Sequence, residues 1–225
     1  MPKLPLEFDA HGLLPVVVQD HLTGEVRMVA FATAEAVRAT LDTGRATFWS
    51  RSRGELWEKG RTSGNAIHVK RVLVDCDADC LIYSAEPEGP SCHTGAPSCF
   101  FQMIENGPGG ETLVQKSEQP QTVLATIEAI LEARKRSTSK SSYTKSLYDG
   151  GADAIGAKVR EEADELARAI ASEPDERVVS EAADVLYHVL VALRWRAIGF
   201  RDVLAALGAR MGTSGHEEKA RRPGK

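Results

Sequence analysis

The stretch Asn106-Gly107-Pro108-Gly109-Gly110, followed by Glu118-Gln119-Pro120-Gln121, decides how this chain is organised. Glycine and proline at this density interrupt helices and strands, so they predict a linker within residues 106–121. Short β-branched and aromatic runs precede the linker, whereas apolar residues at helical spacing follow it. We therefore expect an α+β protein with a β-rich domain over residues 1–112 and an all-α helical bundle over residues 113–225.

The two domains carry different local patterns. Strands are expected at residues 15–18, 26–31, 46–49, 67–74, 81–85 and 99–104, with one helix over residues 34–41. Amphipathic helices are expected over residues 122–136, 155–170, 178–198 and 202–211, with a polar loop over residues 136–142. Because each of these helices is of modest length, we expect the bundle to pair with a second chain.

Composition narrows the class of protein. The chain has 225 residues, of which 42% are hydrophobic and 27% charged, as in ordinary globular proteins. A net charge of −4 argues against a nucleic-acid partner held by bulk charge. The apolar runs are too short to span a membrane, and the first residues lack an apolar signal core, so we expect a cytoplasmic protein with no membrane partner. In such a chain, four cysteines suggest a metal or catalysis more than disulfides.

The first candidate site follows the strand expected at residues 67–74 and reads Asp75-Cys76-Asp77-Ala78-Asp79-Cys80. If this segment is extended, Asp75, Asp77 and Asp79 share one side and the two cysteines face the other. Three carboxylates this close repel one another unless a cation lies among them, and oxygen ligands suit Mg²⁺. The alternative is a solvated acidic loop.

Two further cysteines, Cys92 and Cys99, lie beyond the next expected strand. Sulfur ligands favour Zn²⁺, either in a closed structural site with four cysteines or in an open catalytic site with three. The spacings match no zinc-finger pattern, which does not favour the closed site. His93 follows a candidate ligand, where it can act as a general base beside zinc-bound water or hydrogen-bond a cysteine sulfur.

Residues 49–53 and 59–65 are rich in groups that bind anions. Glycine lets the backbone approach a phosphate, while basic and hydroxyl side chains donate hydrogen bonds. The alternative is an ordinary polar turn. The candidates for phosphate and ribose contacts are Arg51, Lys59, Gly60, Thr62, Ser63, Gly64 and Asn65.

Together, these segments resemble phosphoribosyl-AMP cyclohydrolase over residues 11–104. The resemblance implies a homodimer in which zinc is held by Cys76 of one subunit with Cys92 and Cys99 of the other. It leaves Cys80 outside the ligand set and implies Mg²⁺ at Asp75, Asp77 and Asp79. The sequence departs from the family at Arg61, where an acidic residue is usual, and we expect this to alter substrate affinity slightly.

A second candidate site consists of carboxylates on two expected helices. Glu161, Glu162 and Glu165 lie three or four residues apart on one helix, and Glu181 and Asp184 are similarly spaced on the next. Facing helices with such residues form an acidic pocket for which Mg²⁺ is the natural counter-ion. The alternative is a solvated helix face whose basic partners are Lys158, Arg160 and Arg168.

Residues 142–147, 158–165, 181–188 and 214–220 resemble phosphoribosyl-ATP pyrophosphatase, a member of the all-α nucleoside-triphosphate pyrophosphohydrolases. The likeness covers residues 122–222. It implies that the five carboxylates bind Mg²⁺ and that Lys158 contacts phosphate. We interpret His188, one turn beyond Asp184, as structural rather than catalytic.

The two resemblances predict a bifunctional hydrolase of histidine biosynthesis that binds two small-molecule nucleotides. The C-terminal domain would hydrolyse phosphoribosyl-ATP to phosphoribosyl-AMP and pyrophosphate. The N-terminal domain would then open the adenine ring at N1–C6 with zinc-bound hydroxide, with His93 as the proton carrier. Two competing classes are a non-enzymatic zinc module fused to an interaction bundle, and a general nucleotide pyrophosphatase with a degenerate N-terminal half.

Overall fold

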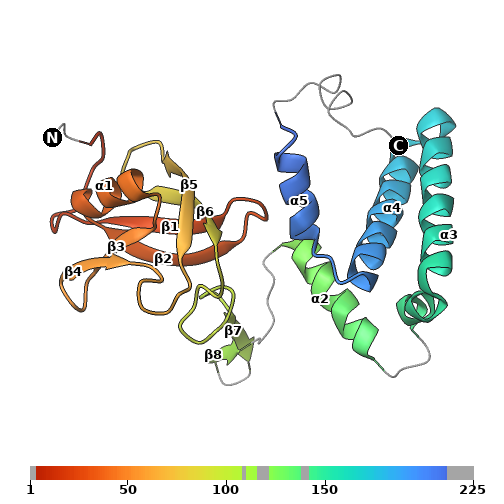
Figure 1. The fold of residues 1–225 in the computed structure, drawn as a ribbon, viewed down its shortest axis with the longest axis horizontal. Coiled ribbons are helices and arrows are strands. Elements are labelled where there is room, and N and C mark those ends of the chain that lie inside the picture. Colours follow the sequence, from red (N-terminus) through yellow and green to blue (C-terminus); the bar gives the residue numbers. More distant parts are fainter. Residues whose placement is uncertain (1–3, 108–109, 116–121, 138–141, 212–225) are drawn as a thin grey trace. The chain divides into compact units, whose positions relative to one another are not determined.

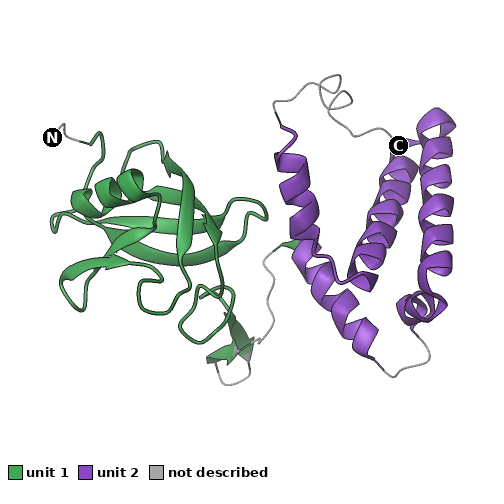
Figure 2. Cartoon of the chain, in the orientation of Figure 1, with its two compact units in different colours: residues 1–122 green, residues 123–225 purple. Residues whose placement is uncertain are grey.

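The computed structural model describes residues 4–107, 110–115, 122–137 and 142–211. The chain divides into two compact units, residues 1–122 and 123–225 (Figure 2). The first unit is built on a β-sheet and the second is helical, so the α+β prediction is confirmed. No helix in the described part of the chain combines the length and the apolar composition needed to cross a membrane.

A six-stranded sheet organises the first unit (Figure 1). Its strands follow the order β4-β3-β2-β1-β6-β5, and the β1–β6 pair is parallel whereas the other pairs are antiparallel. The elements are β1 (Leu14–Asp20), β2 (Val26–Ala32), α1 (Ala34–Thr43), β3 (Thr47–Ser50), β4 (Glu55–Glu58), β5 (Ile67–Val74) and β6 (Leu81–Pro87). Strand β4 was not predicted. It has only four residues, and the first two are exposed.

The core of the first unit follows from strand periodicity. Alternate residues of β1, including Leu14, Val16 and Val18, are buried, as expected when one face of a strand packs on a core. Helix α1 packs on β2 and β3, and its first turn is capped by the Thr33 hydroxyl. The turn after α1 requires a left-handed residue, which Gly44 provides at φ 70°.

The sheet also bends back on itself. The Ala46 N–H donates to the Ile67 carbonyl at 3.0 Å, and the Val69 N–H donates to the Gly44 carbonyl at 2.8 Å. These bonds join the segment before β3 to β5, which is an edge strand in the sheet order. The segment between α1 and β3 therefore lies alongside the start of β5.

A two-stranded hairpin occupies part of the region in which a linker was predicted. Strand β7 (Gln102–Gly107) pairs antiparallel with β8 (Gly110–Gln115). Asn106, Gly107 and Gly110 therefore belong to paired strands, whereas residues 108–109 and 116–121 of the predicted linker lie outside the described residues. The strand expected at residues 99–104 begins three residues later, at Gln102.

Four helices form the second unit: α2 (Val123–Arg136), α3 (Tyr143–Ser172), α4 (Asp175–Trp195) and α5 (Phe200–Gly208). Helix α3 is longer than the predicted helix because it continues across a kink at Gly151, where φ is 67°. The Ser142 hydroxyl caps its first turn. Residues 138–141 of the predicted polar loop and the motif at residues 214–220 lie outside the described residues.

The helical unit has a small buried core, and many of its other apolar residues are exposed. Leu131, Ile155, Leu190 and Val191 are buried at its centre. Other apolar residues remain exposed in the single chain, among them Val123 at 77%, Val179 at 69% and Ile170 at 67%. Exposed apolar side chains in this number are typical of helices that pack against another protein surface.

Candidate active sites

The first unit contains a cavity of about 610 Å³ at the loop that carries two of the cysteines. It is lined by Met28, Arg53, Trp57, Lys59, Gly60, Thr62, Ser63, Asn65, Ser91, Cys92, His93, Gly95 and Cys99. The thiols and the predicted anion-binding loop therefore face one space, although more than 25 residues separate them in sequence. The site is concave and combines hydrogen-bond donors with thiols that can bind a metal, as ligand-binding sites commonly do.

Backbone hydrogen bonds fix the loop that carries Cys92 and Cys99. The Cys99 N–H donates to the Arg27 carbonyl at 2.8 Å, and the Ser98 hydroxyl donates to the Val26 carbonyl at 2.8 Å. The Cys92 N–H donates to the Ala96 carbonyl at 3.1 Å, which closes a tight turn. Strand β2 thus anchors one end of the loop and positions both thiols.

The two thiols affect each other's ionisation. Burial acts to raise the pKa of Cys92, but hydrogen bonds from the Thr94 hydroxyl, at 3.1 Å, and from nearby backbone N–H groups lower that pKa overall. Desolvation and the neighbouring Cys92 charge raise the pKa of Cys99 to about 11. Two adjacent thiolates therefore need a cation to be stable together, and this donor pair fits zinc.

Lys59 lies beside the thiols and is buried. Burial lowers the pKa of Lys59, and the nearby Cys99 and Cys92 sulfurs oppose that shift. Its ammonium donates to the Asn65 carbonyl at 3.2 Å, which holds the loop after β4 closed. This loop requires glycine at position 60, because φ is +89° and a Cβ would lie 2.4 Å from the Ala66 backbone.

Of the seven residues of this unit that were predicted to bind substrate, five line the cavity and two do not. Arg51 stacks over the Phe31 ring, with its guanidinium carbon 4.0 Å from the ring centroid, and Gly64 is also absent from the lining. Arg53 lines the cavity instead and was missed by the sequence analysis. Both arginines belong to the same short motif, so only the turn between β3 and β4 distinguishes them.

His93 is adjacent to the thiols but exposed. Its Nδ1 lies 3.9 Å from the Cys92 sulfur. This contact is compatible with both interpretations of His93, as a proton carrier at the cavity and as a group that orients a sulfur ligand.

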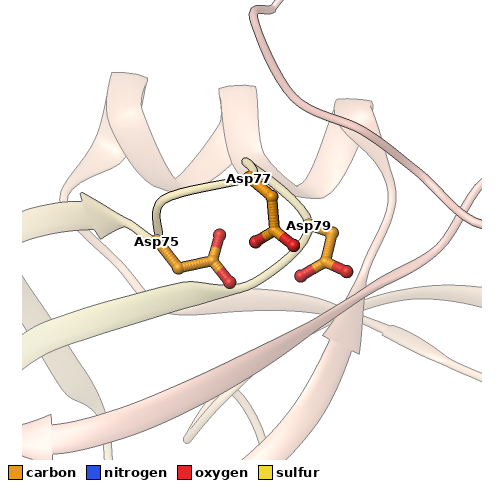
Figure 3. A group of neighbouring side chains, drawn as sticks. All are labelled: Asp75, Asp77 and Asp79. Atoms are coloured by element: carbon orange, nitrogen blue, oxygen red, sulfur yellow. The ribbon is translucent and has the colours of Figure 1, made fainter.

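The three aspartates after β5 converge, as Figure 3 shows. One oxygen of each of Asp75, Asp77 and Asp79 lies within 4.8 Å of the others. The charge of Asp77, followed by a hydrogen bond with Asp75, raises the pKa of Asp79. The carboxylates fit a hard cation such as Mg²⁺.

The aspartates do not converge for the reason expected. The shared side was expected on the condition that the segment is extended, but residues 76–79 form a turn in which Ala78 has φ 64°. The turn is closed by the Cys80 N–H, which donates to the Asp75 carboxylate at 3.1 Å. The strand-alternation argument was therefore wrong, and chain reversal brings the carboxylates together instead.

Cys76 is exposed on the aspartate turn, with its sulfur 3.9 Å from the Asp77 carboxylate. It does not line the cavity that holds Cys92 and Cys99. Within the described part of one chain, these three sulfurs do not form a cluster in which all lie within 4.8 Å of one another. A three-cysteine zinc site therefore cannot be assembled from one chain in this conformation.

The helical unit places its carboxylates across two adjacent helices. One oxygen of each of Glu162, Glu165 and Glu181 lies within 4.8 Å of the others, so α3 and α4 together form the cluster. Glu162 and Glu181 are buried. Burial raises the pKa of Glu181, and nearby Glu165 and Asp184 add to the shift, while Arg177 opposes it. This donor set fits a divalent cation.

Glu161 and Asp184 are exposed at the edge of this cluster. Lys158 pairs with Glu161 at 3.1 Å and with Glu162 at 2.8 Å, and these contacts raise the pKa of Lys158. The solvated-face alternative is thus partly realised, because the cluster has basic partners. Arg177, on α4, pairs with Glu181. This pair was not predicted, although its four-residue helical spacing was a usable signal.

His188 is buried beside the cluster. Its Nδ1 lies 2.9 Å from the Asp184 carbonyl, which can only accept, so Nδ1 carries the proton. Its Nε2 lies 3.1 Å from the Tyr143 hydroxyl. Nδ1 is also 3.8 Å from the Glu162 carboxylate. These contacts agree with the interpretation of His188 as a structural residue.

These features define a two-domain hydrolase of nucleotides, with a thiol-containing β unit and a carboxylate-bearing helical unit. Residues 28–101 match the family model described as phosphoribosyl-AMP cyclohydrolase. Residues 124–211 match that of phosphoribosyl-ATP pyrophosphohydrolase. Each half of the chain thus matches the family that its motifs resemble.

Relatives extend over both units. The chain is 42% identical over 200 residues to the histidine biosynthesis bifunctional protein HisIE of Photobacterium profundum, covering 88% of this chain and 92% of the relative. It is 40% identical over 219 residues to the protein of that name from Wolinella succinogenes, covering 95% and 94%. For the Deinococcus radiodurans protein, identity is 41% over 210 residues, covering 93% and 94%.

The chain belongs to the HisIE family of bifunctional histidine biosynthesis proteins. It is an enzyme with phosphoribosyl-AMP cyclohydrolase and phosphoribosyl-ATP pyrophosphohydrolase domains, in that order. The prediction of a bifunctional hydrolase of histidine biosynthesis is confirmed.

Proposed function

We propose that the helical unit acts first and releases pyrophosphate from phosphoribosyl-ATP with Mg²⁺ held by its carboxylates. The observation that carries this assignment is the convergence of oxygens from two helices within 4.8 Å. The proposed ligands are Glu161, Glu162, Glu165, Glu181 and Asp184. When bound, Mg²⁺ offsets the charge of the triphosphate and makes the phosphorus more electrophilic.

The residues of this unit hold the reacting groups in line. The carboxylates orient a water molecule and accept its proton as its oxygen bonds to one of the two phosphorus atoms that flank the α–β bridging oxygen. The bond to the bridging oxygen then breaks, which yields pyrophosphate and phosphoribosyl-AMP. Lys158 is placed beside Glu161 and Glu162, where its ammonium can contact a phosphate oxygen.

For the β unit, we propose that Cys76 of one subunit and Cys92 and Cys99 of another hold zinc, and that Cys80 is not a ligand. The paired ionisation of Cys92 and Cys99 supports this assignment, as does the position of Cys76 away from their cavity. When bound, zinc lowers the pKa of a water molecule to roughly 7 and so supplies a nucleophile at neutral pH. We assign Mg²⁺ to Asp75, Asp77 and Asp79.

The cavity residues then position phosphoribosyl-AMP for ring opening. Lys59, Thr62, Ser63 and Asn65 supply donors for phosphate and ribose, with Gly60 and Gly64 shaping the loop. In this proposal Arg51 also contacts the phosphate, which requires its guanidinium to move away from the Phe31 ring when substrate binds. Water adds to C6, the N1–C6 bond breaks, and His93 carries the proton to the departing nitrogen, which gives the formimino carboxamide product.

We further propose a cytoplasmic homodimer. The domain boundary expected at residues 112–113 falls within β8, and the compact units instead divide after residue 122. The exposed apolar residues of the helical unit support pairing, since they would be buried by a second chain. Both nucleotides are charged phosphate esters that do not cross membranes, which supports a cytoplasmic location. Neither nucleic acid nor membrane is a proposed partner.

Incubation of the purified protein with phosphoribosyl-ATP tests both activities together. Pyrophosphate is expected first and ring-opened product second, with phosphoribosyl-AMP as the intermediate. Release of pyrophosphate from free deoxynucleoside triphosphates, with none from phosphoribosyl-ATP, would instead support a general nucleotide pyrophosphatase. Bound zinc without turnover of either substrate would support a non-enzymatic module.

A mixing experiment tests whether zinc ligands are shared. The Cys76→Ser variant and the Cys92→Ser, Cys99→Ser double variant should each lack ring-opening activity. After joint unfolding and refolding at equal amounts, about a quarter of the activity should return, because half of the dimers are mixed and each has one intact site. Activity that does not return would exclude ligands shared in this way.

A further inference from the structure

Each carboxylate of the helical cluster already has a basic partner from the protein. Lys158 lies 2.8 Å from Glu162, Arg168 lies 3.6 Å from Glu165, and Arg177 pairs with Glu181. The three pairs are formed by side chains three or four residues apart on the same helix. The negative charge of the cluster is therefore offset locally.

The partners differ in their access to solvent. The side chain of Glu181 is 4% exposed, whereas that of Arg177 is 55% exposed. Arg168 is likewise well exposed, and Lys158 is more accessible than Glu162. Glu162 and Glu181 thus lie inside, Glu165 is partly exposed, and the basic groups extend toward water, where an incoming polyphosphate would meet them first.

A divalent cation and the basic side chains compete for the same oxygens. A metal bound by Glu162, Glu165 and Glu181 would neutralise the carboxylate charge that stabilises the three basic groups in its absence. Arg177 has a second anchor, because its guanidinium also pairs with Glu173 at 3.1 Å. Lys158 similarly contacts Glu161 at 3.1 Å. The Glu173 contact can keep Arg177 at the rim after the metal has displaced it from Glu181.

We propose that Arg168 and Arg177, together with Lys158, are exchangeable partners of the carboxylate cluster that transfer to the phosphates of the nucleotide when metal and substrate bind. The proposal rests on the pyrophosphate-releasing function assigned to this unit and adds two substrate-binding residues to it. Guanidinium groups suit this role because they bind phosphate through two parallel hydrogen bonds.

The exchange predicts that removing an arginine changes metal affinity and substrate affinity in opposite directions. The Arg177→Gln variant removes a competitor of the metal, so Mn²⁺ should bind severalfold more tightly in the absence of nucleotide. The same change removes a phosphate contact, so KM for phosphoribosyl-ATP and the inhibition constant of inorganic pyrophosphate should each rise about tenfold. A structural role alone would weaken both kinds of binding together.

Full-length protein is used for Mn²⁺ titration and for steady-state pyrophosphate release. Arg177→Lys should restore part of the substrate affinity, because it keeps the charge but loses the planar fork. Arg136→Gln is the matched control, since Arg136 forms the same kind of helical pair, with Glu132 at 3.0 Å, away from the cluster. It should change neither constant.

Weaker Mn²⁺ binding in Arg177→Gln, or an unchanged KM, would overturn the proposal. If Arg177→Gln loses the helical circular dichroism of the wild type, Arg168→Gln replaces it in the test. That variant should also bind Mn²⁺ more tightly and show a higher KM, with smaller changes because its ion pair is longer and more exposed. A wild-type protein that releases no pyrophosphate would refute the function of the unit, whereas normal release with unaffected arginine variants would refute only the exchange.

Discussion

The two candidate sites differ in how much of each is contained in one chain. In the helical unit, oxygens of Glu162, Glu165 and Glu181 converge on two packed helices. In the β unit, Cys92 and Cys99 share a cavity whereas Cys76 lies on a separate turn. Helical spacing can therefore specify a site almost by itself, while ligands on loops depend on where tertiary and quaternary contacts place each loop.

The sites also differ in how they offset their own charge. The helical carboxylates have basic partners three or four residues away. The partly desolvated Lys59 acts to lower the pKa of Cys99, yet that pKa still reaches about 11. The thiol pair thus depends more strongly on an added cation, and the two units should respond differently to substitution.

The largest expected effect is on ring opening in Cys92→Ser. Loss of a metal ligand should lower this activity by more than the about 10–100-fold typical of residues that merely orient a ligand. Pyrophosphate release from phosphoribosyl-ATP should remain near the wild-type rate, because the helical unit has its own core. Assays of both products in one reaction provide the measurement. Loss of both activities would show that the units are not independent.

The reverse experiment replaces Glu162 and Glu165 with glutamine. Pyrophosphate release should fall about a hundredfold, since the neutral amides no longer stabilise a cation in the cluster. Ring opening should persist when phosphoribosyl-AMP is supplied directly. Undiminished pyrophosphate release would remove these carboxylates from the mechanism.

Two cysteines on the same turn form a matched pair for zinc content. Cys76→Ser should be purified with little zinc, whereas Cys80→Ser should retain it, because only Cys76 is a proposed ligand. Metal analysis distinguishes them, and a zinc-free Cys80→Ser variant would support the closed four-cysteine site.

The smallest effect concerns the scaffold of the helical unit. Hydrogen bonds from Arg194, at 2.7 Å, and from Arg136 lower the pKa of Glu132 below its usual 4.5. The resulting stability is present above that pH and is lost as pH falls through the lowered pKa. Glu132→Gln should cost up to about 1 kcal/mol at pH 7. Thermal unfolding should show this difference shrink at acid pH, and a difference that grows there would contradict the assignment.

Much of the architecture followed from local pattern. The β-branched run at residues 15–18 predicted a strand that the structure contains, and the spacing of Glu162 and Glu165 predicted carboxylates that share one face of a helix. The hairpin of β7 and β8 was not recognised, because glycine and proline allow both a linker and a tight reversal. The choice between Arg51 and Arg53 likewise had no local signal.

The sequence by itself determined the class of each unit and the chemical type of each site, because side-chain periodicity and ligand chemistry are local properties. Only the tertiary structure decided that the aspartates meet through a turn at Ala78, that Arg53 reaches the cavity, and that Cys76 is separated from the other thiols. Those outcomes depend on backbone reversals and on contacts between distant segments, such as the bond from Cys99 to Arg27, which residue spacing does not encode.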